Sequence, residues 1–171
     1  MPSSRRRALV VLVLLLGVIS VASATIDAPP VATFTNEDEN AYRITVFSPP
    51  NLQTARSTEI TVTSPDGIRR TETVADVDFH EQYRNSSVTD ETIETSSFTL
   101  EPGDEVSITV QSWMPGDVTV YLIEERAGNN SYTRADIVTC TKRQQKYRWT
   151  FEAGGGSGSS VCASPLDWIL W

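Results

Sequence analysis

Short stretches in which apolar and polar residues alternate recur along the chain from residue 31 onward. Alternation places apolar side chains on one face of a β-strand, and no window after the first 24 residues has the period of an amphipathic helix. The chain is therefore expected to be all-β. The predicted strands are Val31–Thr35, Ala41–Phe47, Thr58–Thr63, Ile68–Val74, Ser97–Leu100, Glu105–Ser112, Val118–Glu125, Tyr132–Cys140 and Lys146–Glu152.

Turn signals separate these runs. Ser64-Pro65-Asp66-Gly67 places Pro and Gly where a tight turn needs first a fixed φ and then a positive one, which predicts a hairpin. Pro-Gly-Asp recurs at 102–104 and at 115–117, and Gly-Asn-Asn stands at 128–130. About nine short strands with one apolar face each predict a two-sheet antiparallel β-sandwich of the immunoglobulin-like kind.

Three segments do not fit the strand pattern. The acidic stretch Ala75–Ser96 is expected to be mostly a long loop, and the Gly/Ser run at 154–160 a flexible link. The chain then ends in an apolar tail, Pro165–Trp171. We expect a single domain over residues 25–171, because 147 residues is close to the commonest domain size.

The first 24 residues have the three parts of a signal peptide. Arg5–Arg7 form a positive region, Ala8–Val21 is almost entirely apolar, and Ala22-Ser23-Ala24 offers small residues for cleavage. The alternative is an uncleaved N-terminal anchor helix, but 17 residues would span only about 26 Å of a core about 30 Å thick. We predict cleavage after Ala24 and an extracellular or cell-surface location, with membrane attachment through residues 8–24 if the leader is retained.

The charge of the chain is acidic, with 14 basic and 22 acidic residues and a net charge of −8. Without the three arginines of the leader the net charge is −11, which argues against nucleic acid and anionic membrane surfaces as partners. Only two basic residues are lysines, and threonine is abundant. This composition resembles that of exported haloarchaeal proteins, whose dense carboxylates keep the surface hydrated in concentrated salt.

The residues suited to catalysis or metal binding are few. His80 is the only histidine, so a copper site of the two-histidine kind is excluded, and zinc would lack ligands. Cys140 and Cys162 form an even pair in an exported chain and predict a disulfide. No cofactor and no enzymatic activity are expected.

Several surface features suggest interaction or modification instead. Residues 142–148 are the one basic stretch and are expected at a charged hairpin tip that could bind an acidic neighbour. Two tryptophans in the tail need burial, in the chain's own core, in another subunit or at a membrane interface. Sequons at two predicted loops suggest N-glycosylation. The candidate residues are Lys142, Arg143, Lys146, Arg148, Trp168 and Trp171 for interaction, and Asn85 and Asn129 for glycosylation.

The strand, Pro-Gly turn and strand at Phe98–Val110 resemble those of many immunoglobulin-like domains. The resemblance implies a non-enzymatic cell-surface structural or binding module, with other surface proteins or copies of itself as partners. Leader, size and sandwich character also resemble TasA-like filament proteins, which implies a subunit exchanging Thr25–Phe34 or the tail as a strand. A secreted hydrolase is the weakest alternative, since the many carboxylates single out no pair.

Overall fold

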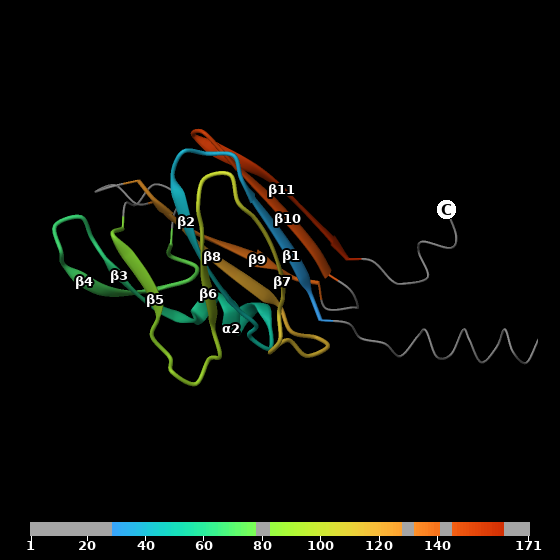
Figure 1. Ribbon diagram of the computed structural model, residues 1–171. Coiled ribbons are helices and arrows are strands. Elements are labelled where there is room, and N and C mark those ends of the chain that lie inside the picture. The colour runs from blue at the N-terminus through green and yellow to red at the C-terminus, as the bar shows by residue number, and fades with distance from the viewer. Residues whose placement is uncertain (1–28, 78–82, 128–131, 141–144, 163–171) are drawn as a thin grey trace, which may run out of the picture.

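The computed structural model describes residues 29–77, 83–127, 132–140 and 145–162, and this part of the chain folds into eleven strands and one short helix (Figure 1). Nine of the strands coincide closely with the predicted ones. The elements are β1 (Val31–Asn36), β2 (Ala41–Phe47), α2 (Leu52–Ser57), β3 (Glu59–Thr63), β4 (Arg69–Thr73), β5 (Asn85–Val88), β6 (Ser96–Leu100), β7 (Glu105–Thr109), β8 (Thr119–Arg126), β9 (Thr133–Val138), β10 (Gln145–Glu152) and β11 (Gly155–Cys162).

The strands form three sheets. Sheet A has the order β11-β10-β1-β7, sheet B the order β6-β2-β8-β9, and sheet C the order β4-β3-β5. Every pairing is antiparallel except β1 with β10, which run parallel. The prediction of an all-β, immunoglobulin-like sandwich is confirmed for sheets A and B, which pack face to face.

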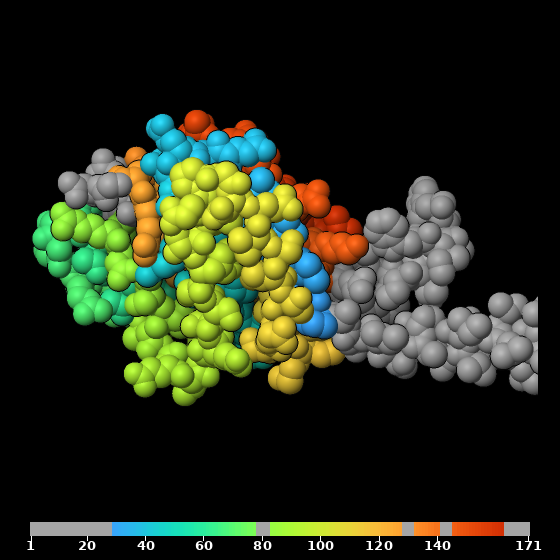
Figure 2. Space-filling model, viewed as in Figure 1, coloured from blue at the N-terminus to red at the C-terminus, as the bar shows by residue number. Residues whose placement is uncertain are grey.

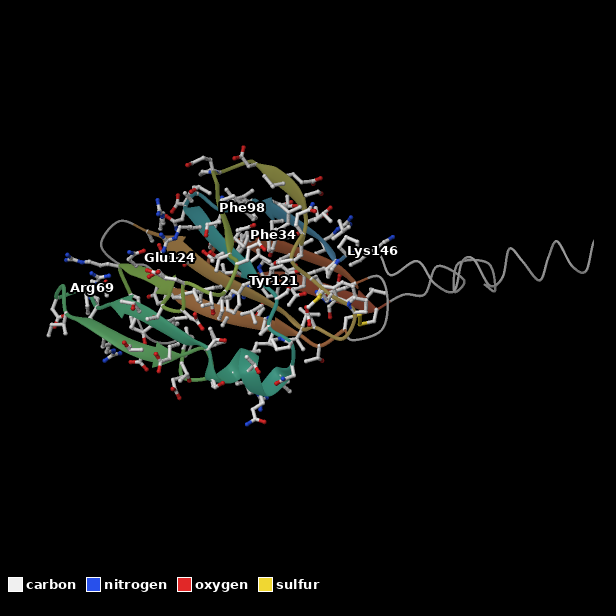
Figure 3. The ribbon with its side chains drawn as sticks, turned by 90° about the horizontal axis from the view of Figure 1, so that it is seen from below. Phe34, Arg69, Phe98, Tyr121, Glu124 and Lys146 are labelled. Carbon is white, nitrogen blue, oxygen red and sulfur yellow. A yellow bond between two sulfur atoms is a disulfide. The ribbon has the colours of Figure 1, made fainter. Side chains whose placement is uncertain are left out.

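Aromatic rings fill the space between sheets A and B. Phe34 of β1 contacts Phe98, Tyr121, Tyr147 and Phe151, with ring centroids 5.6 to 6.4 Å apart. Figure 3 shows Phe34, Phe98 and Tyr121 converging from both sheets. Alternation along each strand aims these rings inward, as the sequence pattern predicted.

Sheet C was not predicted, and it makes the domain three layers deep. Its apolar side chains pack on the face of sheet B that is turned away from sheet A, where they meet Val120 and Leu122 of β8. Tyr121 and Ile123 of the same strand face sheet A. A strand with apolar residues at consecutive positions has no side fit for water, so both of its faces are covered. The two-sheet prediction was therefore incomplete.

Two strands lie where irregular segments were expected. β5 occupies part of the predicted loop at 75–96 and pairs with β3. β11 replaces the predicted flexible link at 154–160 and pairs with β10 over eight consecutive positions. The glycines have a packing role here, because a Cβ at Gly158 would overlap the ring of Trp149. The prediction of a link was wrong in this respect.

The first and last strands of the described chain, β1 and β11, have their outer ends at the same end of sheet A. Val31 pairs with Lys146, and Lys146 pairs with Val161, so all three lie in one row across the sheet. Figure 2 shows the start of β1, in blue, on the opposite side of the molecule from sheet C, in green. No helix of the described residues is long and apolar enough to cross a membrane. The predicted leader and the tail 165–171 lie outside the described residues.

Candidate functional site

The described part of the predicted basic stretch, residues 145–148, lies within a strand. Lys146 and Arg148 belong to β10, between β1 and β11, while Tyr147 and Trp149 point into the sandwich. Side chains alternate along a strand, so Lys146 and Arg148 project from the outer face of sheet A, where both are exposed. Lys142 and Arg143 lie outside the described residues.

Exposed apolar side chains flank the two basic residues. Lys146 lies between Val31, which is 41% exposed, and Val161, which is 53% exposed. Arg148 lies between Thr33 of β1 and Ser159 of β11. We call Val31, Lys146, Arg148 and Val161 the basic end of sheet A. Its mixed character allows ion pairing and apolar contact with the same partner surface.

The side of the sandwich between β9 and β10 is covered by the Arg134 side chain, which stacks on the ring of Trp149. The guanidinium of Arg134 lies 3.5 Å from the centroid of the Trp149 ring, within cation–π range. Arg134 also pairs with Asp136 at 3.5 Å, and the Tyr147 hydroxyl donates to Asp136 Oδ2 at 2.6 Å. Burial lowers the pKa of Arg134 and raises that of Tyr147. These polar groups therefore have a structural role, since they cover the apolar core at this side of the sandwich.

A pocket of about 380 Å³ opens beside this flank. Its lining includes Tyr42, Glu125, Tyr132, Arg134 and Phe151. Tyr42 stacks on Phe151 with ring centroids 4.0 Å apart. Aromatic walls with one carboxylate and one guanidinium are a lining that suits a small polar ligand.

The carboxylates around this pocket are engaged within the fold. Asp38 Oδ2 accepts a hydrogen bond from the Tyr42 hydroxyl at 2.6 Å, and its Oδ1 accepts from the Glu39 N–H at 2.6 Å. Glu125 Oε1 accepts from Asn40 Nδ2 at 2.9 Å. Burial, followed by the charge of Asp38, raises the pKa of Glu125. The acidic turn at 36–40 thus forms a hydrogen-bonded corner, and the described residues hold no group of three or more potential metal ligands.

An ion pair within sheet B also hydrogen-bonds to β5 of sheet C, and no feature of the sequence predicted it. Glu124 of β8, only 2% exposed, pairs with Arg43 of β2 at 2.8 Å. The same carboxylate oxygen accepts from the backbone N–H of Ser86 at 2.9 Å and from its hydroxyl at 3.1 Å. Figure 3 shows Glu124 directed toward β5. Since the members are far apart in sequence and belong to three strands, only the strand order could have revealed the cluster.

The other predicted residues have mixed outcomes. The disulfide between Cys140 and Cys162 is confirmed, and it fixes the end of β11 to the segment that follows β9. Asn85 lies in β5 rather than in a loop; it is exposed, and its side-chain oxygen accepts from Arg43. Its glycosylation stays a prediction. His80, Asn129, Trp168 and Trp171 lie outside the described residues.

Comparison with known proteins links the chain to one family. The family model for halobacterial Ig domain proteins matches residues 1–171. No curated protein matches. Two solved structures are similar in part: one described as a "trapped toxin" (8% identity, TM-score 0.34, 80% of this chain) and a putative cell adhesion protein from Bacteroides ovatus ATCC 8483 (14% identity, TM-score 0.33, 79% of this chain).

The chain spans only 24% and 43% of the lengths of those two proteins. At TM-scores of this size the likeness says nothing about function. The family match has a different weight, since it covers every residue and agrees with the sandwich of sheets A and B. The acidic composition agrees with it as well. The chain therefore belongs to the family of halobacterial Ig domain proteins.

Proposed function

We propose that the protein is a non-enzymatic module of the haloarchaeal cell surface that binds an acidic, partly apolar partner surface through the basic end of sheet A. The observation that carries the proposal is the exposure of Lys146 and Arg148 beside Val31 and Val161, on a chain whose net charge is −8. Membership of an Ig-domain family supports a binding or structural role. The partner is another surface protein or a copy of this one.

Concentrated salt limits the kinds of interaction that this surface can make. The Debye length is about 3 Å at 1 M salt, so long-range steering of an acidic partner is screened. Only charges in direct contact contribute, and apolar contact is strengthened or left intact. A patch in which Val31 and Val161 lie beside Lys146 meets both requirements.

The test is a matched pair of double charge reversals. Lys146→Glu with Arg148→Glu removes the basic end, and Arg56→Glu with Arg69→Glu changes the net charge equally at exposed positions elsewhere. Figure 3 shows Arg69 and Lys146 at opposite ends of the molecule. Binding of the purified protein to envelopes from cells lacking it should fall for the first variant and not for the second. Equal binding by both variants would refute the proposal.

The filament alternative makes a different demand on the fold. β1 contains most of the apolar part of the suggested donor strand and is paired on both sides, with β10 and β7, inside its own sheet. Donating it would remove the centre of sheet A. Donation by the tail 165–171 stays open to test by electron microscopy of the purified protein at high salt, where filaments would favour the alternative.

The hydrolase alternative has little support in the pocket. The carboxylates of Asp38 and Glu125 accept hydrogen bonds from Tyr42 and Asn40. These bonds give both carboxylates partners within the fold. We therefore favour a structural role for this corner.

A further inference from the structure

β11 is a long sheet edge that is fully exposed. All eight of its residues are exposed, and it is the outermost strand of sheet A, paired on one side with β10. Among the described residues no strand pairs with its other side. Such an edge presents a row of backbone N–H and C=O groups to which another strand can bond.

The usual protections of an edge strand are missing from β11. Its sequence, Gly-Gly-Ser-Gly-Ser-Ser-Val-Cys, holds no charge and no proline, and its register with β10 is unbroken by a bulge. Two other edges of the described fold, β4 and β9, carry several charges and β7 carries Glu105, whereas the shorter edges β5 and β6 carry none. β4 has Arg69, Arg70 and Glu72, and β9 has Arg134 and Asp136.

β11 is also fixed to the sheet by packing and by a disulfide. Trp149 of β10 lies against Gly158 on the inner side of the strand, and the disulfide fixes Cys162 at its end. A strand ordered before binding loses little entropy when a second strand is added. The edge is therefore prepared for pairing, although the sequence alone suggests a linker.

We propose that β11 is a self-association site at which two copies pair their β11 strands antiparallel about a twofold axis at Gly158. Directly opposite residues in an antiparallel pair point to the same face of the sheet. Ser157 and Ser159 both point outward, in register with Thr150 and Arg148. A twofold axis at Gly158 places Ser157 of one copy opposite Ser159 of the other, and sheet A then runs continuously through both copies.

The charges on the neighbouring β10 strands lie too far from the seam to oppose this arrangement in concentrated salt. Glu152 is in register with Gly155, and Lys146 with Val161. The twofold axis places Gly155 of one copy opposite Val161 of the other, so Glu152 and Lys146 of different copies lie in one row, roughly 14 Å apart at three strand spacings. The seam itself is uncharged, so the acidic surface of each copy does not oppose contact there.

The test measures association of the purified full chain by sedimentation equilibrium at high salt over a series of protein concentrations. The wild type should show a concentration-dependent monomer–dimer equilibrium. Ser157→Lys with Ser159→Lys places like charges opposite each other twice and should raise the dissociation constant on the order of tenfold. Ser157→Asp with Ser159→Lys places opposite charges at the same positions and should keep the dimer.

Each outcome decides the matter, provided that circular dichroism shows the variants folded. A wild type that stays monomeric at every concentration overturns the proposal. This is the result expected if residues 163–171 or another segment covered β11. A dimer that resists both lysines, or that is lost equally in the Asp/Lys variant, overturns the register. The inference is independent of the proposed function. Reversing the charges of Lys146 and Arg148 should abolish envelope binding and leave dimerisation intact. The Ser157→Lys, Ser159→Lys variant should lose dimerisation and keep envelope binding.

Discussion

Replacing Gly158 with alanine is expected to destabilise the protein, although it adds one methyl group to an exposed strand. A Cβ there would overlap Cε3 of Trp149, lie 2.5 Å from Cζ3 and lie 2.9 Å from Cδ2. The indole cannot move away freely, because its ring holds the Arg134 guanidinium at 3.5 Å. Overpacking costs about 1–3 kcal/mol, and the roughly 0.4–1 kcal/mol that alanine gains by restricting the unfolded chain offsets only part of it.

Urea unfolding at fixed salt, followed by tryptophan fluorescence, measures this effect. Gly155→Ala is the matched control, since Gly155 lies in the same strand without a positive φ and a Cβ there meets nothing within 4 Å. The control should be as stable as the wild type or slightly more stable. In a Trp149→Phe background the cost of Gly158→Ala should shrink, because the smaller ring leaves room. If Gly158→Ala and Gly155→Ala have the same stability, the packing of Trp149 on β11 is refuted.

Three further predictions concern the polar groups and the disulfide. Arg43→Ala leaves the buried Glu124 carboxylate with Arg126, 3.7 Å away, as its remaining cation, which should cost about 1–3 kcal/mol after a discount for the partial exposure of Arg43; urea unfolding showing less than about 0.5 kcal/mol would contradict the ion pair. Because the pKa of Glu125 is raised in the fold, the stability it gives is present at low pH and is lost as pH rises through the folded pKa; Glu125→Gln should remove that loss, and pH profiles of unfolding that coincide for the two proteins would exclude it. Replacing both Cys140 and Cys162 with serine should lower stability by roughly 3 kcal/mol for a loop of this length, whereas an unchanged midpoint would show that the bond contributes nothing.

Much of the fold could be predicted from the alternation of side chains. β1, β2 and β10 alternate apolar and polar positions over most of their length, and Pro and Gly mark the turns between many strands. Strand β8 departs from simple alternation. One apolar face per strand is the expectation, but Val120 and Leu122 pack against sheet C while Tyr121 and Ile123 face sheet A. A continuous apolar run in a strand was the sign of a third layer.

β5, β11 and α2 were missed for local reasons. β11 is rich in glycine and serine, which on composition alone favour a linker, and its pairing depends on the ring of Trp149 in another strand. β5 is short, and its central Ser86 is buried because Glu124 accepts its hydrogen bonds. α2 begins where the Asn51 side chain accepts from the Thr54 N–H at 2.8 Å, and it is too short to show a period.

The interaction residues were only partly predictable for the same reason. The basic stretch was found from composition, but its position on the outer face of sheet A follows from the pairing of β10 with both β1 and β11. The exposed partners Val31 and Val161 come from strands far apart in the sequence. A surface patch assembled from three strands has no continuous signature in the chain.

Whether this is a cell-surface protein can be measured by labelling intact cells with a membrane-impermeant amine reagent. The chain contains two lysines, Lys142 and Lys146, and Lys146 is exposed in the folded domain. We expect Lys146 to be modified on intact cells, and mass spectrometry of the same material to find a chain beginning at Thr25. Modification of Lys146 only after the cells are lysed would contradict a location at the surface.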